Sequence, residues 1–180
     1  MLERLPDAGL LLDVGCGEGY LLAAAHAARP ALALHGIDHD RRRLDLARRA
    51  LADVPALTLD DRDATQATLP PCDVIACLDV LHYLPFDRQD ALLDALVDGL
   101  RPGGLLVIRD AEPGRGWRSA ATIGAERLAR VIGRHRGAVL AFRSLDEVGA
   151  RCAEHGLAVE IGPCADGTPF SNRLVVARRA

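Results

Sequence analysis

Short apolar runs alternate along the chain with longer segments in which apolar residues recur every three or four positions. Four runs in the first half of the chain predict strands, at residues 10–14, 32–37, 56–59 and 74–78. Three periodic segments predict helices, at residues 20–28, 41–51 and 88–100. Parallel strands need long crossover connections, and both faces of a parallel sheet must be covered. The alternation therefore predicts an α/β fold with a mostly parallel sheet.

The chain departs from this alternation after the third helix. The run Arg-Pro-Gly-Gly at residues 101–104 predicts a turn that ends the helix and starts a fifth strand at residues 105–108. A start rich in Gly and Pro is then followed by apolar residues at helical spacing, namely Trp117, Ala121, Ala125, Leu128 and Ile132. Residues 111–143 are therefore expected to form a helical insertion beside the sheet.

The last quarter of the chain predicts one helix and two strands. Ser144 is the expected N-cap of the helix, with Glu147 as its capping-box partner, and the helix is expected to run to His155. Two apolar runs follow, at residues 157–161 and 174–177. The loop between them is rich in Gly, Pro and Asp, which favours an antiparallel return of the chain.

Length and composition indicate one globular domain. A chain of 180 residues fits a single domain, residues 1–180, with one sizeable core. Apolar residues make up 49% of the chain and charged residues 26%, and no apolar run is long enough to span a membrane. The first seven residues contain an early acid and a proline where a signal peptide needs a basic start and a long apolar stretch. We therefore expect a cytoplasmic protein.

Cysteine spacing and charge exclude several classes of function. The five cysteines form no CxxC pair and have no histidines at zinc-finger spacing, so we expect buried free thiols and no metal site; they are Cys16, Cys72, Cys77, Cys152 and Cys164. The net charge of -3 and the six scattered aromatic residues disfavour nucleic-acid binding.

A glycine-rich run at residues 11–20, Leu-Leu-Asp-Val-Gly-Cys-Gly-Glu-Gly-Tyr, carries the most specific signal. It joins a predicted strand to a predicted helix, and its glycines let the backbone turn tightly and let a ligand approach the main chain. The fingerprint of dinucleotide-binding domains is G-x-G-x-x-G, whereas the spacing here is G-x-G-x-G with Asp13 ahead of it. The spacing favours a different nucleoside ligand, and an NAD-dependent oxidoreductase stays as a less favoured alternative.

The run Asp-Val-Gly-Cys-Gly-Glu-Gly at residues 13–19 resembles the first motif of class I S-adenosylmethionine-dependent methyltransferases. Later segments are similar to further motifs of that family in the same order, at residues 36–39, 62–64, 72–84 and 100–104. The resemblance implies S-adenosylmethionine as the cofactor and a Rossmann-like, doubly wound sheet of seven strands. It also implies the strand order 3-2-1-4-5-7-6 with an antiparallel last strand.

The same resemblance implies where the cofactor binds. Asp38 is expected to accept hydrogen bonds from both ribose hydroxyls, for which a carboxylate is suited because it has only acceptors. Asp63 is expected near the adenine amino group, with Asp61 as a less favoured substitute. The full set of expected cofactor-binding residues is Asp13, Gly15, Cys16, Gly17, Gly19, Tyr20, Asp38, His39, Asp63, Ala64, Leu78 and Asp79. The alternatives are a helix N-cap for Asp38 and a solvated loop acid for Asp63.

Methyl transfer needs the acceptor in line with the methyl carbon and the sulfur, so a base is useful only if the acceptor must lose a proton. His82 is the expected base and Asp110 the second expected catalytic residue. The alternatives are a structural histidine that hydrogen-bonds the loop and an ion pair formed by Arg109 or Asp110. Tyr83 either orients the acceptor or packs in the core.

The predicted insertion and its flank are basic, with Arg115, Arg118, Arg127, Arg130, Arg134, His135, Arg136 and Arg143. Either these side chains form a solvated face or their charge attracts an anionic acceptor or an acidic acyl carrier protein. Residues 109–118 and 167–172 are also similar to small bacterial methyltransferases of aryl polyene pigment and lipid pathways. We therefore expect methylation, at oxygen first, of a small aromatic or acyl metabolite; the alternative is a non-catalytic subunit or sensor that binds S-adenosylmethionine.

Overall fold

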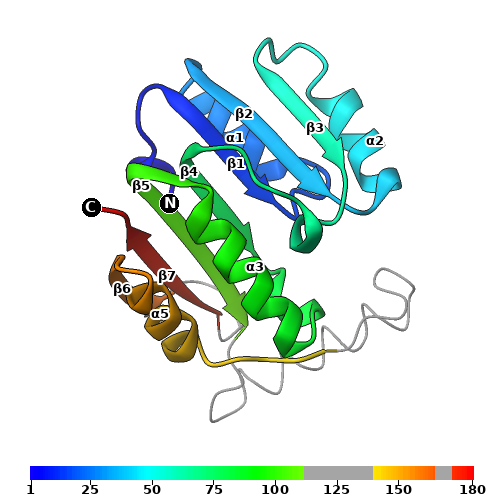
Figure 1. Ribbon diagram of the computed structural model, residues 1–180. Coiled ribbons are helices and arrows are strands. Elements are labelled where there is room, and N and C mark those ends of the chain that lie inside the picture. Colours follow the sequence, from blue (N-terminus) through cyan, green and yellow to red (C-terminus); the bar gives the residue numbers. More distant parts are fainter. Residues whose placement is uncertain (112–139, 165–171) are drawn as a thin grey trace.

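The computed structural model describes residues 1–111, 140–164 and 172–180 and contains one seven-stranded sheet in the order β3-β2-β1-β4-β5-β7-β6 (Figure 1). β1 to β5 are parallel, and β7 is antiparallel to both of its neighbours, β5 and β6. The strands are β1 (Gly9–Val14), β2 (Leu32–Asp38), β3 (Leu57–Asp61), β4 (Cys72–Leu78), β5 (Leu100–Ala111), β6 (Ala158–Pro163) and β7 (Asn172–Arg178). The predicted strand order and the antiparallel last strand are confirmed.

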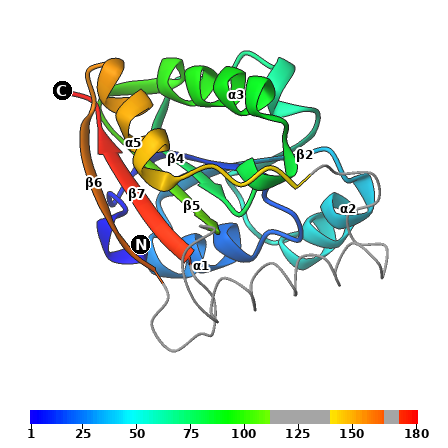
Figure 2. The same cartoon turned by 90° about the horizontal axis from the view of Figure 1, so that it is seen from below.

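The helices cover both faces of the sheet, as Figure 2 shows from below. Helices α1 (Tyr20–Ala28) and α2 (Arg41–Ala50) lie on one face, and α3 (Phe86–Asp98) and α5 (Leu145–Glu154) lie on the other. Alternate residues of β1 point to opposite faces. Leu11 accordingly belongs to the hydrophobic cluster that includes Leu22 of α1, whereas Leu12 belongs to the cluster that includes Leu92 of α3. Three short 3-10 turns complete the described elements, η1 (Leu2–Arg4), η2 (Ala64–Gln66) and η3 (Leu81–Tyr83).

Local capping sets where the helices begin. The Asp40 side chain accepts a hydrogen bond from the Arg42 N–H at 2.9 Å and starts α2. Ser144 accepts from the Asp146 N–H at 3.2 Å, which confirms its prediction as the N-cap of the last helix. Pro85 precedes α3, so this helix begins at Phe86, two residues earlier than predicted.

The start of β5 was predicted wrongly. Residues 101–104, predicted as a turn before the strand, lie inside β5, which already pairs with β4 at Leu100. The register shifts across this run, because Cys72 pairs with Leu100 whereas Val74 pairs with Leu105. The Gly103 N–H donates to the carbonyl of Arg179 at 3.1 Å, and the Arg179 N–H donates to the carbonyl of Gly104 at 3.1 Å. Pairing with a residue at the far end of the chain therefore holds these glycines in the strand as an irregularity.

Four of the five cysteines are buried free thiols, as predicted, but Cys164 is partly exposed at the end of β6. Among the residues that the structure describes, no helix is long and apolar enough to span a membrane. The predicted insertion helix, with Trp117 and most of the basic residues, lies outside the described residues. The same is true of the loop at residues 165–171.

Candidate functional site

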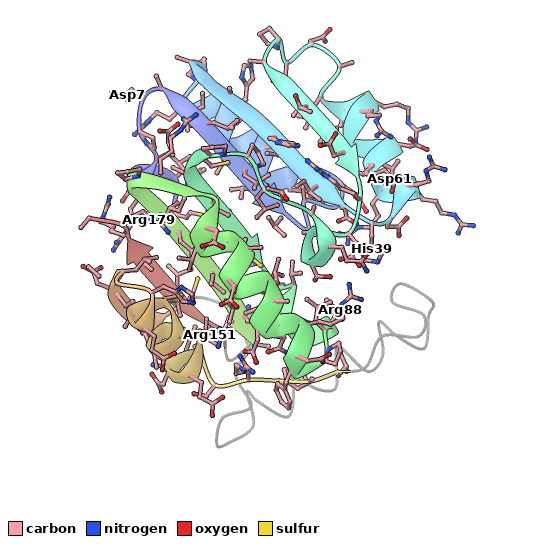
Figure 3. The ribbon with its side chains drawn as sticks, in the orientation of Figure 1. Asp7, His39, Asp61, Arg88, Arg151 and Arg179 are labelled. Atoms are coloured by element: carbon pink, nitrogen blue, oxygen red, sulfur yellow. The ribbon has the colours of Figure 1, made fainter. Side chains whose placement is uncertain are left out.

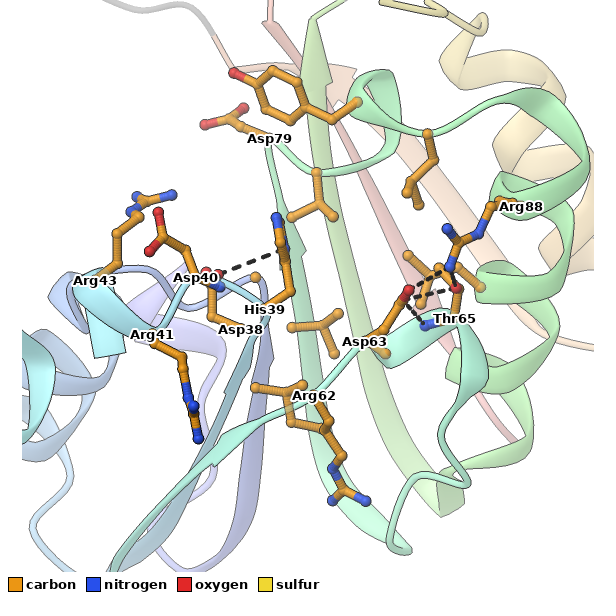
Figure 4. Close-up of a pocket in the computed structure, with 18 of the residues that line it drawn as sticks. Asp38, His39, Asp40, Arg41, Arg43, Arg62, Asp63, Thr65, Asp79 and Arg88 are labelled. Atoms are coloured by element: carbon orange, nitrogen blue, oxygen red, sulfur yellow. Dashed lines mark hydrogen bonds and ion pairs between the residues drawn. The ribbon is translucent and has the colours of Figure 1, made fainter. Parts of the chain in front are cut away.

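A cavity of about 620 Å³ opens at the carboxyl ends of β1 to β4 (Figure 4). Open parallel sheets bind ligands at this edge, where the strand order reverses, and the reversal here lies between β1 and β4. Six of the predicted cofactor-binding residues line the cavity: Gly15, Asp38, His39, Asp63, Ala64 and Asp79. The fold therefore brings together residues that are far apart in the sequence.

The other six predicted cofactor-binding residues do not line this cavity; they are Asp13, Cys16, Gly17, Gly19, Tyr20 and Leu78. Asp13 and Cys16 belong to the glycine-rich run and are buried, 4% and 7% exposed. Tyr20 points to solvent, 75% exposed, and its hydroxyl donates to the Glu18 carboxylate at 2.8 Å. Only half of the predicted cofactor-binding residues therefore line the cavity.

The glycine-rich loop is held against β2. The N–H groups of Gly15 and Cys16 both donate to the carbonyl of Ile37, at 2.8 and 3.1 Å. Gly15 has a φ of 75°, and a Cβ there would lie 2.4 Å from Cγ2 of Val80, which also lines the cavity. Both the left-handed backbone conformation and the close approach of Val80 require glycine at position 15.

Replacing Gly15 by alanine is therefore expected to destabilise the fold through two effects. A left-handed conformation costs a residue with a Cβ about 1 kcal/mol, and the contact with Val80 adds an overpacking cost of about 1 kcal/mol or more. Gly103→Ala is the matched control, because Gly103 has a φ of 74° but no atom within 4 Å of its Cβ position. Urea unfolding should show a larger loss for Gly15→Ala than for Gly103→Ala. Equal losses would contradict the contact with Val80.

Asp38 is buried, 5% exposed, and two backbone donors hold its carboxylate. The Gly17 N–H donates to Oδ2 and the Asp40 N–H donates to Oδ1, each at 2.8 Å. Each oxygen keeps capacity for one more donor. The N-cap of α2 is Asp40 and not Asp38, so the alternative of a helix cap does not explain Asp38.

Asp13 lies close to Asp38 in a dry environment. Burial, with a smaller contribution from the negative charge of Asp38, raises the pKa of Asp13 to about 7. Ionising a buried carboxyl costs free energy unless a positive charge lies near it. Burial therefore favours the protonated form of Asp13 up to about neutral pH.

Asp63 is held by Arg88 from the side of the cavity opposite Asp38 (Figure 4), and Figure 3 shows Arg88 on α3. It accepts from the Thr65 N–H at 3.0 Å and from the Thr65 hydroxyl at 2.7 Å, and the Arg88 guanidinium donates to it as well. Partial burial opposes ionisation of Asp63, but these hydrogen bonds outweigh it and lower its pKa. Asp61 instead forms an ion pair with Arg41. The sequence analysis missed Arg88, since nothing local links it to a residue 25 positions earlier.

Asp79 has a positive φ of 57° and forms an ion pair with Arg109. The Arg109 Nε donates to Asp79 Oδ1 at 3.1 Å, and the Asp79 N–H donates to the Arg109 carbonyl at 2.8 Å. The hydrogen bond to Asp79 raises the pKa of Arg109. The sequence alternative of an ion pair at the end of β5 is thus confirmed for Arg109, and its partner is a cavity residue.

His82 and Asp110 form a buried pair, 2% and 3% exposed. The His82 Nδ1 and Oδ1 of Asp110 are in close contact, and the backbone N–H of His82 donates to Asp110 Oδ2 at 3.0 Å. Asp110 Oδ1 also accepts from the Ala111 N–H at 2.7 Å. Neither residue lines the cavity, whereas Tyr83 does. This geometry matches the alternative in which His82 is a structural histidine.

Residues 12–106 match the family described as "Methyltransferase domain", which is more than half of the chain. The chain therefore belongs to this family of methyltransferase domains. S-adenosylmethionine is the cofactor that this family indicates.

Similar proteins include two curated relatives and a solved structure. The chain is 35% identical to trans-aconitate 2-methyltransferase of Azoarcus sp. (strain BH72) over 61% of this chain and 42% of that relative. It is 28% identical to ubiquinone biosynthesis O-methyltransferase of Xylella fastidiosa (strain 9a5c) over 98% of this chain and 72% of that relative. The fold matches N-methyltransferase NodS from Bradyrhizobium japonicum WM9, in complex with S-adenosyl-L-homocysteine, with a TM-score of 0.70 over 96% of this chain and 79% of that chain, at 22% identity. The chain spans less than half the length of the first relative.

Proposed function

We propose that this protein transfers a methyl group from S-adenosylmethionine to a small aromatic or acyl metabolite, at an oxygen atom. The observation that carries the proposal is the convergence of Gly15, Asp38 and Asp63 on one cavity, at the edge of the sheet where such ligands bind. When bound, the cofactor supplies an activated methyl group on a sulfonium. The protein's part is to hold and orient the two reactants, which by itself provides much of the catalysis.

The residues of the cavity fit a nucleoside. Asp38 keeps one acceptor site on each oxygen for the two ribose hydroxyls, and its bonds to the Gly17 and Asp40 N–H groups hold it in place. Asp63 is kept ionised by Thr65 and Arg88 and is thereby suited to accept from the adenine amino group. Asp13, with its raised pKa, is suited to become ionised when a cationic ligand enters nearby.

The similarity to a ubiquinone biosynthesis O-methyltransferase supports oxygen as the acceptor atom. The roles of His82 as a base and of Asp110 as a second catalytic residue stay predictions, to be tested on a real acceptor. An acyl carrier protein as partner, a single-domain organisation, a cytoplasmic location and the kinship with pigment and lipid pathways also stay predictions. Of the basic residues that suggested a carrier protein, Arg143 lies among the described residues and pairs with Asp90.

Replacing Asp38 by alanine is expected to weaken binding of S-adenosylmethionine and S-adenosylhomocysteine about tenfold or more, which corresponds to about 1.4 kcal/mol of lost hydrogen bonding to ribose. Calorimetric titration of the purified proteins measures this directly. The matched control is Asp61→Ala, because Asp61 pairs with Asp38 in register at the same edge of the sheet but does not line the cavity. Its affinity should stay within about threefold of the wild-type value.

Three outcomes separate the alternatives when NAD is titrated as well and turnover is measured on candidate acceptors. Binding that depends on Asp38 and not on Asp61 supports the cofactor site and makes acceptor screening worthwhile. Heat with NAD but not with S-adenosylmethionine would favour the oxidoreductase. Cofactor binding without turnover on any acceptor would favour a non-catalytic subunit or sensor.

A further inference from the structure

Gln89 is a buried polar side chain that the proposed chemistry does not use. It lies on α3, is fully buried, and donates both of its amide hydrogen bonds to backbone carbonyls. Its Nε2 lies 2.9 Å from the carbonyl oxygen of Leu84 and 2.7 Å from that of Ala141. Its Oε1 is buried without a hydrogen-bond partner among the described residues. Among the described residues, every hydrogen bond of this side chain therefore depends on its donors.

The first of these carbonyls belongs to the wall of the cavity. Val80, Tyr83 and Leu84 line the cavity at the end of β4. Two hydrogen bonds within the turn hold its shape, from the Tyr83 N–H to the Val80 carbonyl at 3.1 Å and from the Leu84 N–H to the Leu81 carbonyl at 2.9 Å. Gln89 is bonded to the last residue of this turn but does not itself line the cavity.

The second carbonyl belongs to residues 140–143, which lead into α5. The Ala141 N–H donates to the His82 carbonyl at 2.9 Å, so Ala141 is bonded through both of its backbone groups. The Phe142 ring stacks on the His82 ring with centroids 5.4 Å apart. The guanidinium of Arg143 lies 5.4 Å from the centre of the Phe86 ring and pairs with Asp90. The turn, α3 and residues 141–143 are thus joined around Gln89.

We infer that Gln89 is a positioning residue for the cofactor pocket: by donating to Leu84 and Ala141 together, it holds the Val80–Leu84 wall in the place that ligand binding requires. The inference rests on the proposed cofactor site and adds a residue that does not touch the ligand. A buried carbonyl that loses its donor bears the cost of desolvation. Losing Gln89 would leave one such carbonyl on the wall and another on the segment bonded to it, which favours displacement of the wall. The cost of losing Gln89 should therefore be seen in ligand affinity and not in stability alone.

Two substitutions separate a need for donors from a need for shape. Gln89→Met keeps the length of the side chain and removes both donors at every pH. Gln89→Glu keeps the shape, but an ionised carboxylate has only acceptors and would face two carbonyl oxygens, whereas the protonated acid has one O–H to donate. Of the charged groups on the elements around this position, Arg143 pairs with Asp90, His82 with Asp110, and Arg88 with Asp63. A recovery at low pH would thus report on the introduced acid.

The test is calorimetric titration with S-adenosylhomocysteine at pH 8 and pH 5.5, each affinity expressed relative to wild type at the same pH. We expect Gln89→Met to bind about tenfold more weakly at both pH values, and Gln89→Glu to bind at least about tenfold more weakly at pH 8 but within about threefold at pH 5.5. Val97→Ala is the control, since Val97 is a buried residue of the same helix that does not line the cavity. It should lower the melting temperature and leave the affinity unchanged.

A folded Gln89→Met variant with wild-type affinity would overturn the inference, as would a Gln89→Glu variant whose relative affinity does not change with pH. If neither variant folds, hydrogen exchange of the wild-type protein decides. Saturation with S-adenosylhomocysteine should then slow exchange at the Ala141 N–H, and unchanged exchange would overturn the inference. A wild-type protein that binds no S-adenosylhomocysteine would overturn the proposed cofactor site itself. Binding that does not depend on Gln89 would overturn only the inference about Gln89.

Discussion

Replacing Asp110 by alanine is expected to lower the free energy of unfolding by about 3–5 kcal/mol, the cost of removing one member of a buried ionisable pair. Asp110 accepts from the His82 N–H at 3.0 Å and from the Ala111 N–H at 2.7 Å, and it contacts the His82 ring. Alanine would leave these donors buried without their acceptor, and each such donor costs about 1–3 kcal/mol. Urea unfolding followed by circular dichroism measures the loss, and the melting temperature should fall by about 10 °C.

The control for Asp110 is Arg101→Ala. Arg101 pairs with Asp73 at 2.6 Å, but the two side chains are 46% and 33% exposed, so the loss should stay below about 1 kcal/mol. An Asp110→Ala variant no less stable than Arg101→Ala would contradict the buried pair. Unchanged turnover of an identified acceptor in a folded His82 variant would contradict the catalytic role that the sequence predicted for His82.

Replacing Asp13 by asparagine is expected to stabilise the protein at neutral and alkaline pH. Burial and the charge of Asp38 raise the pKa of Asp13 from 3.8 to about 7, so between these values the folded state binds more protons than the unfolded state. The free energy of unfolding of the wild type therefore falls as the pH rises through this window, and the penalty is complete above about pH 7. At about 1.4 kcal/mol per pKa unit, the penalty reaches about 4 kcal/mol. Asparagine cannot ionise, so the variant does not bear this penalty.

The measurement is urea unfolding of both proteins at intervals from pH 4.5 to pH 8.5. The stability difference in favour of Asp13→Asn should grow with pH and level off above about pH 7. Asp53→Asn serves as the control because Asp53 is exposed, and its difference from wild type should not grow across this range. A flat difference for Asp13→Asn would contradict the raised pKa. Under the proposed function the same variant should bind S-adenosylmethionine more weakly than the wild type, since it lacks a negative charge near the cationic ligand.

Much of the fold could be predicted because its signals are local. Helix α1 has the predicted bounds, and most other predicted elements begin and end within two residues of those in the structure. The exception at the start of β5 is instructive, because Gly103 and Gly104 would form an ordinary turn in isolation. Their pairing with Arg179, which lies more than seventy residues away, keeps them in the sheet.

The candidate site likewise has residues that the sequence predicted and residues that it did not. The glycine-rich loop and Asp38 were predictable because they sit at the ends of strands whose apolar pattern is clear, and parallel strands bring those ends to one edge. Arg88 and Gln89 gave no such signal. Each lies on an ordinary-looking helix and makes its contact with residues 25 and 52 positions away, respectively.

The sequence by itself determined most of the strands and helices and the acids at the strand ends, because hydrophobic periodicity and glycine spacing act over a few residues. The strand order followed from the resemblance to methyltransferases. Only the tertiary structure decided which of the polar side chains face the cavity. It placed His82 and Asp110 behind the wall as a buried pair, set Arg88 and Arg109 against the acids that the sequence had singled out, and revealed Gln89. The physical reason is that burial and hydrogen-bond partners depend on how distant segments pack, and no local pattern encodes them.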